Sequence, residues 1–90
     1  MRSNDPITII PAQIRAGRAL VKLSAEDLAE RAKVGIATVR RAESDGGANT
    51  SAVVLNALRL ALEAAGVEFI PADDGGPGVR LKLMGQTLKD

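Results

Sequence analysis

A chain of ninety residues with a formal net charge of +1 is long enough for one small domain. It has no cysteine and no histidine, which excludes disulfides, thiolate chemistry, zinc sites built from these residues and histidine-based acid–base catalysis. Phe69 is its single aromatic residue, which argues against binding of RNA or single strands, because such proteins stack bases on aromatic side chains.

The charge is unevenly distributed along the chain. Residues 1–44 carry eight basic and five acidic side chains (+3), whereas residues 45–90 carry four basic and six acidic ones (−2). A basic half is typical of a surface that binds duplex nucleic acid, although ordinary surface scatter is the competing explanation. The N-terminus lacks a signal-peptide pattern and no apolar run reaches about 18 residues, so we expect a cytoplasmic protein without membrane contact.

The first elements lie between residues 7 and 22. The segment "ITII" at residues 7–10 is either an apolar arm or a short strand. Pro11 suits the first turn of a helix, since that position needs no N–H donor. Ile14, Gly17 and Val21 then share one helical face, and the glycine predicts a close approach by another element.

The next two predicted helices are joined by the short turn "KVG". Ser24 begins the earlier helix as its cap, and Asp27 stands where a capping-box carboxylate belongs. The later helix, "IATVRRAES", turns Val39 and Ala42 inward. Its predicted outward residues are Ile36, Ala37, Arg40, Arg41 and Ser44.

The second half begins with a glycine-rich loop. Thr50 or Ser51 caps a long apolar helix that Gly66 ends. Residues 67–84 alternate apolar and charged side chains around "PADDGGPG", which predicts a β-hairpin with a long loop. The chain therefore divides into a helical domain at residues 1–66, a hairpin at 67–84 and a loose tail at 85–90.

Three small or apolar residues favour a helix-turn-helix. Ala29 is the small residue in the middle of the first of the two helices, Val34 follows the turn, and Val39 anchors the second helix. This spacing is what two helices need in order to pack tightly at a steep angle. Similar pairs also occur in helix bundles that bind no DNA, so that alternative stays open.

From about Pro11 to Val67 the chain resembles the Cro/cI-type (XRE) helix-turn-helix regulators. The segment "IRAGRALVKLSAEDLAERAKVGIATVRRAE" has an Arg-bearing helix, "LS", an acidic pair, "LA", the turn, "T-V-x-R" and a Glu. The closing "LEAAGVEFIPADDGGPGVRLK" is similar to short bacterial regulators that end in a helix and hairpin. The resemblance implies a mainly α fold: a four- to five-helix, lambda-repressor-like domain with a C-terminal β-hairpin.

The resemblance also implies roles for individual residues. Arg18 and Glu43 match a structural ion pair between the first and third helices, and Ser24, Ala25 and Thr38 match phosphate-binding positions. The positions that match base contacts are Ile36, Ala37, Arg40, Arg41 and Ser44. Lys33 stands where the family usually has glycine, and Gly35 stands where serine usually caps the recognition helix.

The chemistry of the outward residues allows two interpretations. Arginine reads guanine through O6 and N7, and apolar side chains contact the thymine methyl group. The competing interpretation is that Arg40 and Arg41 are solvated charges and that Ile36 and Ala37 pack inside. Three further candidates for phosphate contact, each with a plain surface or turn role as its alternative, are Arg15, Lys33 and Asn49.

The predicted function is a sequence-specific regulator, most simply a repressor, that binds double-stranded DNA at a palindromic operator as a homodimer, without cofactor or metal. No catalytic constellation is present in the sequence, so we do not expect an enzyme. The expected dimer interface is the apolar face of the hairpin: Val67, Phe69, Val79, Leu81 and Leu83. The alternative is a protein-interaction module such as an antitoxin or anti-activator, and a regulatory protein partner is compatible with either function.

Overall fold

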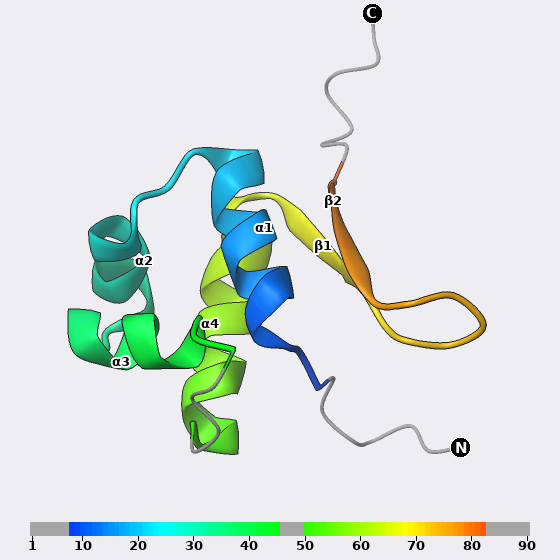
Figure 1. Ribbon diagram of the computed structural model, residues 1–90. Helices are drawn as coiled ribbons and strands as arrows, with labels where there is room; N and C mark the ends of the chain where they lie inside the picture. The colour runs from blue at the N-terminus through cyan, green and yellow to red at the C-terminus, as the bar shows by residue number, and fades with distance from the viewer. Residues whose placement is uncertain (1–7, 46–49, 83–90) are drawn as a thin grey trace, which may run out of the picture.

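The computed structural model describes residues 8–45 and 50–82, which form four helices followed by a two-stranded antiparallel hairpin (Figure 1). The mainly helical class is confirmed. The tail at 85–90 and the predicted hairpin residues beyond 82 lie outside the described residues. The elements are α1 (Pro11–Val21), α2 (Ala25–Ala32), α3 (Ile36–Ala42), α4 (Ala52–Ala65), β1 (Val67–Ile70) and β2 (Gly78–Leu81).

The helix boundaries follow local sequence signals. Ser24 precedes α2, and its hydroxyl accepts a hydrogen bond from the Asp27 N–H at 2.9 Å. Of the two cap candidates for α4, Ser51 accepts from the Val54 N–H at 3.1 Å. Gly66 ends α4 with φ of +115°, a backbone angle that glycine adopts without steric cost. None of the helices in the described ranges has the length and apolar character needed to span a bilayer.

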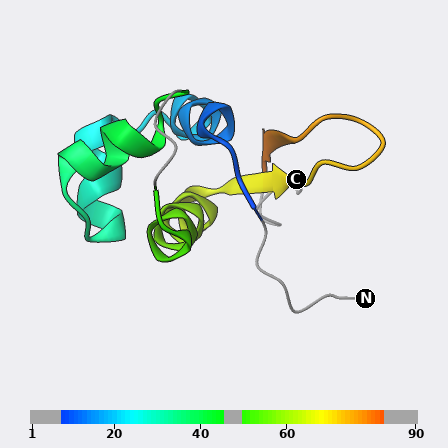
Figure 2. The same ribbon diagram turned by 60° about the horizontal axis from the view of Figure 1, so that its bottom comes forward.

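The core joins all four helices to the hairpin. In Figures 1 and 2, α1 and α4 lie in the middle, α2 and α3 pack on one side of them, and the hairpin lies on the other side. The largest fully buried side chains come from five elements: Ile14, Leu28, Val39, Leu58, Leu62 and Val67. The α2–α3 pair and the hairpin therefore lie at opposite ends of one continuous core.

Gly17 marks the closest approach to α1. A Cβ atom there would lie 3.4 Å from both Leu62 Cδ1 and Val67 Cγ1. The predicted close contact thus involves the end of α4 and the start of β1. A Cβ atom would just make contact there, so a side chain that extends beyond Cβ would push these two elements away from α1.

The apolar segment before α1 forms no strand at residues 8–10, which corrects one of the two alternatives for "ITII". Ile9 is only 3% exposed and belongs to the core, while Ile10 precedes the first turn of α1. Burial of Ile9 needs no strand partner, because its side chain packs against the helices. Residues 1–7 are outside the described ranges.

The hairpin pairs Val67 with Leu81 and Phe69 with Val79, as the alternating pattern predicts. Val67 and Phe69, however, are 0% and 5% exposed within a single chain. Their expected role at the dimer surface is therefore wrong, because α1 and α4 already cover them. Val79 is half-buried and Leu81 is exposed, whereas Leu83 lies outside the described residues.

A buried glutamine links α1 to the hairpin. The Gln13 side-chain amide donates to the carbonyl oxygens of Gly78 at 2.9 Å and Ile70 at 3.3 Å. Its side-chain oxygen accepts from the Ile10 N–H at 2.9 Å. Gln13 is 3% exposed, so these bonds satisfy a polar group that water does not reach. They hold both strands against the start of α1.

Replacing Gln13 by Ala should lower the free energy of unfolding by about 1–3 kcal/mol, because the half-buried carbonyl groups of Ile70 and Gly78 lose their donor. Urea denaturation followed by circular dichroism measures this change. Glu30→Ala is the control, since Glu30 is exposed on α2 and its loss should change stability by less than about 0.5 kcal/mol. Equal effects of the two variants would contradict the role of Gln13.

Candidate nucleic-acid interface

The connection between α2 and α3 is the tight turn that the sequence predicts. Lys33 ends α2 in the left-handed conformation, with φ of 62° and ψ of 43°. The Val34 N–H donates to the Ala29 carbonyl at 3.0 Å, which closes the helix end. Gly35 precedes α3 with φ of −74°, an extended conformation open to any residue. The unusual backbone angle thus falls on the lysine and not on the neighbouring glycine.

The end of α1 repeats this arrangement. Lys22 has φ of 59° and ψ of 39°, and the Leu23 N–H donates to the Arg18 carbonyl at 3.0 Å. Two helices therefore terminate on a left-handed lysine, where glycine is the usual residue. A positive charge at a helix C-terminus interacts favourably with the helix dipole, which offsets part of the steric cost.

Small and apolar side chains hold α2 and α3 together. Ala29 is 6% exposed, Val39 is fully buried, and Ala42 is 2% exposed. Val34 packs against this core from the turn. The residues expected to fasten the two helices are therefore inside, which leaves the opposite face of α3 outward.

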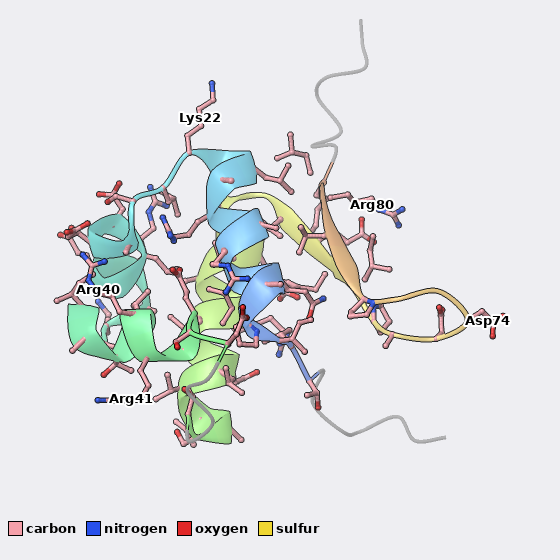
Figure 3. All side chains as sticks on the ribbon, in the orientation of Figure 1. Lys22, Arg40, Arg41, Asp74 and Arg80 are labelled. Carbon is pink, nitrogen blue, oxygen red and sulfur yellow. The ribbon has the colours of Figure 1, made fainter. Side chains whose placement is uncertain are left out.

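That outward face carries four of the five expected base-contacting residues. Ala37, Arg40, Arg41 and Ser44 are all exposed. Ile36 differs, because it is half-buried and packs against the core. The prediction that Ile36 faces outward is therefore corrected: only part of its side chain is exposed. Thr38, a candidate for phosphate contact, is also half-buried. Figure 3 shows Arg40 and Arg41 at the outer edge of the α2–α3 unit.

The two arginines of α3 differ in their surroundings. Arg40 Nη2 lies 3.4 Å from Glu26 Oε2 of α2, and the two side chains are 63% and 68% exposed. An ion pair this exposed contributes at most about 1 kcal/mol. Within residues 8–45 and 50–82, Arg41 has no carboxylate partner. Both guanidinium groups are therefore accessible to a ligand from solvent.

The start of α2 is less open to phosphate than the sequence suggests. The Ser24 N–H donates to Asp27 Oδ2 at 3.1 Å, and the Asp27 N–H donates to the Ser24 hydroxyl. The Ser24 bonds hold the pKa of the Asp27 carboxyl below its usual value, so this capping box is charged at neutral pH. In the free protein the Ser24 N–H therefore already has an acceptor, and the contact of Ser24 with a DNA phosphate stays a prediction. The backbone N–H groups of Ala25 and Glu26 are the next two along the start of α2. The side chain of Ala25 itself is buried.

Arg18 and Glu43 form the expected ion pair between α1 and the end of α3. Arg18 Nε lies 2.6 Å from Glu43 Oε2, and Arg18 Nη2 donates to Glu43 Oε1 at 3.0 Å. Arg18 Nη1 also donates to the Leu23 carbonyl at 3.1 Å. The bidentate contact raises the pKa of Arg18, despite the opposing effect of burial. Arg18 therefore serves the scaffold, as predicted.

Arg15 does not stand free for phosphate contact. Its Nη1 donates to the Glu43 carbonyl oxygen and lies 3.1 Å from Asp45 Oδ1. The carbonyl groups at a helix C-terminus attract cations, which accounts for this placement. In the free protein Arg15 therefore supports the end of α3, and its contact with a DNA phosphate stays a prediction. Asn49, the remaining phosphate candidate, lies outside the described residues.

Sequence reasoning missed two contributors to this architecture, Gln13 and the Arg15–Asp45 pair. Gln13 stands four residues before Gly17 and eight before Val21, so it lies on their apolar face of α1. A polar residue on such a face indicates a buried hydrogen-bonding group. The Arg15–Asp45 pair spans 30 residues and leaves no local pattern.

A scan of the sequence against protein-family models finds no match, and a search of curated proteins finds no relative. The assignment of a function therefore depends on the geometry and chemistry of the α2–α3 unit.

Truncation of Arg18 to Ala should lower the free energy of unfolding by about 3 kcal/mol, because it leaves the Glu43 carboxylate buried without a partner. Chemical denaturation of Arg18→Ala, Glu43→Gln and the double variant gives the coupling energy. We expect Arg18→Ala to cost much less stability in the Glu43→Gln background. Additive losses would show that the two side chains do not depend on each other.

Lys33→Gly should raise the free energy of unfolding by up to about 1 kcal/mol, because glycine relieves the left-handed backbone. Lys22→Gly is the matched variant, since its backbone angles are nearly the same. Thermal unfolding of both variants should show increases of similar size. A decrease in both would contradict the strain argument.

Proposed function

We propose that this protein is a Cro/cI-type helix-turn-helix regulator that binds double-stranded DNA in a sequence-specific manner. The observation that carries the proposal is the α2–α3 unit, in which Val39 and Ala42 face inward while Arg40 and Arg41 face outward. In this arrangement a short helix presents its side chains to the DNA while the preceding helix supports it.

The exposed face of α3 has the chemistry for reading a major groove. A guanidinium group donates two hydrogen bonds to guanine O6 and N7, which discriminates against other bases by about 1–3 kcal/mol. Ala37 has a methyl group for contact with thymine, and Ile36 adds the exposed part of its side chain. An α-helix such as α3 is about 10–12 Å in diameter with its side chains, which fits a major groove about 12 Å wide.

The Arg40–Glu26 pair adds a specific consequence. In the free protein Glu26 holds the guanidinium near the junction of α2 and α3. On DNA, Arg40 exchanges this carboxylate for a base edge, and the exposed pair costs little to break. Glu26 then stands near a polyanion, which disfavours binding wherever Arg40 finds no acceptor. This repulsion favours sites that offer Arg40 a guanine.

A single α3 reads too few base pairs for useful selectivity, so the proposal includes a homodimer on a palindromic operator. The two half-sites are then about one helical turn of DNA apart. Occupation of a promoter by this dimer represses transcription. The proposed mechanism requires no cofactor for DNA binding.

The experiment is selection of duplexes from a random library and from genomic fragments, followed by affinity measurements at several salt concentrations. We expect one preferred, two-fold symmetric sequence and binding that weakens steeply with salt. A folded protein that prefers no duplex would refute the proposal and favour the protein-interaction alternative.

Arg40→Ala and Arg41→Ala should each weaken binding to the selected duplex, roughly 5- to 150-fold for a lost guanine contact. Arg80→Ala is the matched control, because its side chain is also 63% exposed and paired with a carboxylate, but it lies on the hairpin. Its affinity should stay within about twofold of the wild-type value. Unchanged affinity of both α3 variants would remove α3 as the recognition helix.

A further inference from the structure

The helix α4 has an apolar stripe on its outer face. The stripe consists of Val53, Ala57, Leu60 and Ala64, at successive spacings of four, three and four residues. Val53 is 79% exposed and Leu60 is 50% exposed. Two large apolar side chains one heptad apart on one helix are typical of a surface that packs against another helix.

The stripe faces away from the core. Successive residues in a helix turn by about 100°, so the stripe lies on the side opposite Leu58 and Leu62, which are fully buried. Figure 2 looks nearly along α4 and shows α1, the α2–α3 unit and β1 around three of its sides. Among the described residues, no helix or strand covers the remaining side.

The order of side chains along the stripe makes it complementary to itself. Large and small residues alternate from Val53 to Ala64. If two copies of α4 pack antiparallel around a two-fold axis, Val53 of each faces Ala64 of the other. Leu60 of each then faces Ala57 of the other, so every large side chain meets a small one. We propose that this stripe is the homodimer interface, with a second copy of this chain as its occupant.

Charge on α4 permits this contact. Arg59 and Glu63 are the only charged residues of α4. Arg59 Nη1 lies 3.0 Å from Glu63 Oε2 within the same helix, so the pair neutralises itself. A second copy of α4 therefore brings no unpaired like charge to the interface.

The competing surface on the hairpin is less suitable. Val67 and Phe69 are already buried in the single chain. Arg80 of β2 is paired with Glu68 of β1 at 3.0 Å, and Lys82 follows the strand. Charged side chains of this kind on an edge strand disfavour its pairing with a strand of another chain. Leu81 is the one large apolar side chain of the described hairpin residues that is strongly exposed.

The size of the α4 contact sets the expected strength of the dimer. A helix of 14 residues is about 21 Å long, and one pair of such helices buries less than the roughly 800 Å² per partner of a standard stable interface. The dimer should therefore dissociate in the micromolar range in solution. This inference rests on the homodimer of the proposed function, and its tests contain no DNA, so a failure to bind DNA leaves them interpretable.

The first test is the dimer dissociation constant from sedimentation equilibrium of the wild-type chain, Leu60→Glu and Leu81→Glu. The two leucines are 50% and 52% exposed, so the variants place the same charge at equally accessible positions on the two competing surfaces. We expect Leu60→Glu to raise the dissociation constant at least tenfold and Leu81→Glu to leave it within twofold. Val53→Glu should act like Leu60→Glu, and circular dichroism checks that each variant is folded.

The second test is disulfide cross-linking. The chain has no cysteine, so only the introduced thiols can form a disulfide. Positions 53 and 64 lie about 16 Å apart along one helix, beyond the reach of about 7 Å between Cα atoms that a disulfide allows. The double variant Val53→Cys, Ala64→Cys should therefore oxidise to a covalent dimer. Each single variant should remain uncross-linked under the same conditions. Its only possible partner is the same cysteine in the other chain, which lies about 16 Å away along the antiparallel helices.

Any one of three results would overturn the inference. These are a wild-type chain that stays monomeric at millimolar concentration, a dissociation constant that responds to Leu81→Glu and not to Leu60→Glu, and a double cysteine variant that fails to cross-link in a dimeric sample. In the last two cases the homodimer of the proposed function survives with a different interface. Sequence-selective DNA binding is tested independently of all three.

Discussion

Two arginines of α1 hold the C-terminal end of α3, and the position of the candidate DNA-binding face depends on them. Arg18 binds the Glu43 carboxylate through two nitrogens, and Arg15 binds the Glu43 carbonyl oxygen and Asp45. The buried side of α3 is small, with Val39 and Ala42 as its fully inward residues. Packing alone therefore leaves a seven-residue helix weakly oriented, whereas the charged contacts fix its far end relative to α1.

The packing of the hairpin against the helices determines which apolar side chains stay on the surface. Val67 and Phe69 complete the core, and Gln13 binds carbonyl oxygens of both strands, so the hairpin belongs to the monomer. Val67 and Phe69 are then unavailable to a partner, whereas Leu81 stays exposed. Among the described residues, the apolar stripe of α4 is then the surface whose alternation of large and small side chains is self-complementary.

Two helices end on a lysine in the left-handed backbone conformation, and local interactions offset the steric cost of that conformation. Lys22 and Lys33 both adopt positive φ, and in each case the next N–H bonds back to the helix. The hydrogen bond and the charge at the helix C-terminus offset a steric cost of about 1 kcal/mol. At Lys33 the result is an ammonium group at the turn before α3, and contact of this group with a DNA phosphate stays a prediction from the sequence.

The sequence by itself determined the elements of this protein. Local signals such as the Ser24 cap, the Gly66 stop and the period-two pattern of the hairpin act over a few residues and are visible in the chain. The inward residues of α2 and α3 and the Arg18–Glu43 pair were also predictable, the pair through a family resemblance. Only the tertiary structure decided the roles of Arg15, Gln13 and Phe69, because each depends on a partner from a distant segment. Whether an apolar or charged side chain is free for a ligand is a property of the packed domain, since burial depends on which elements meet.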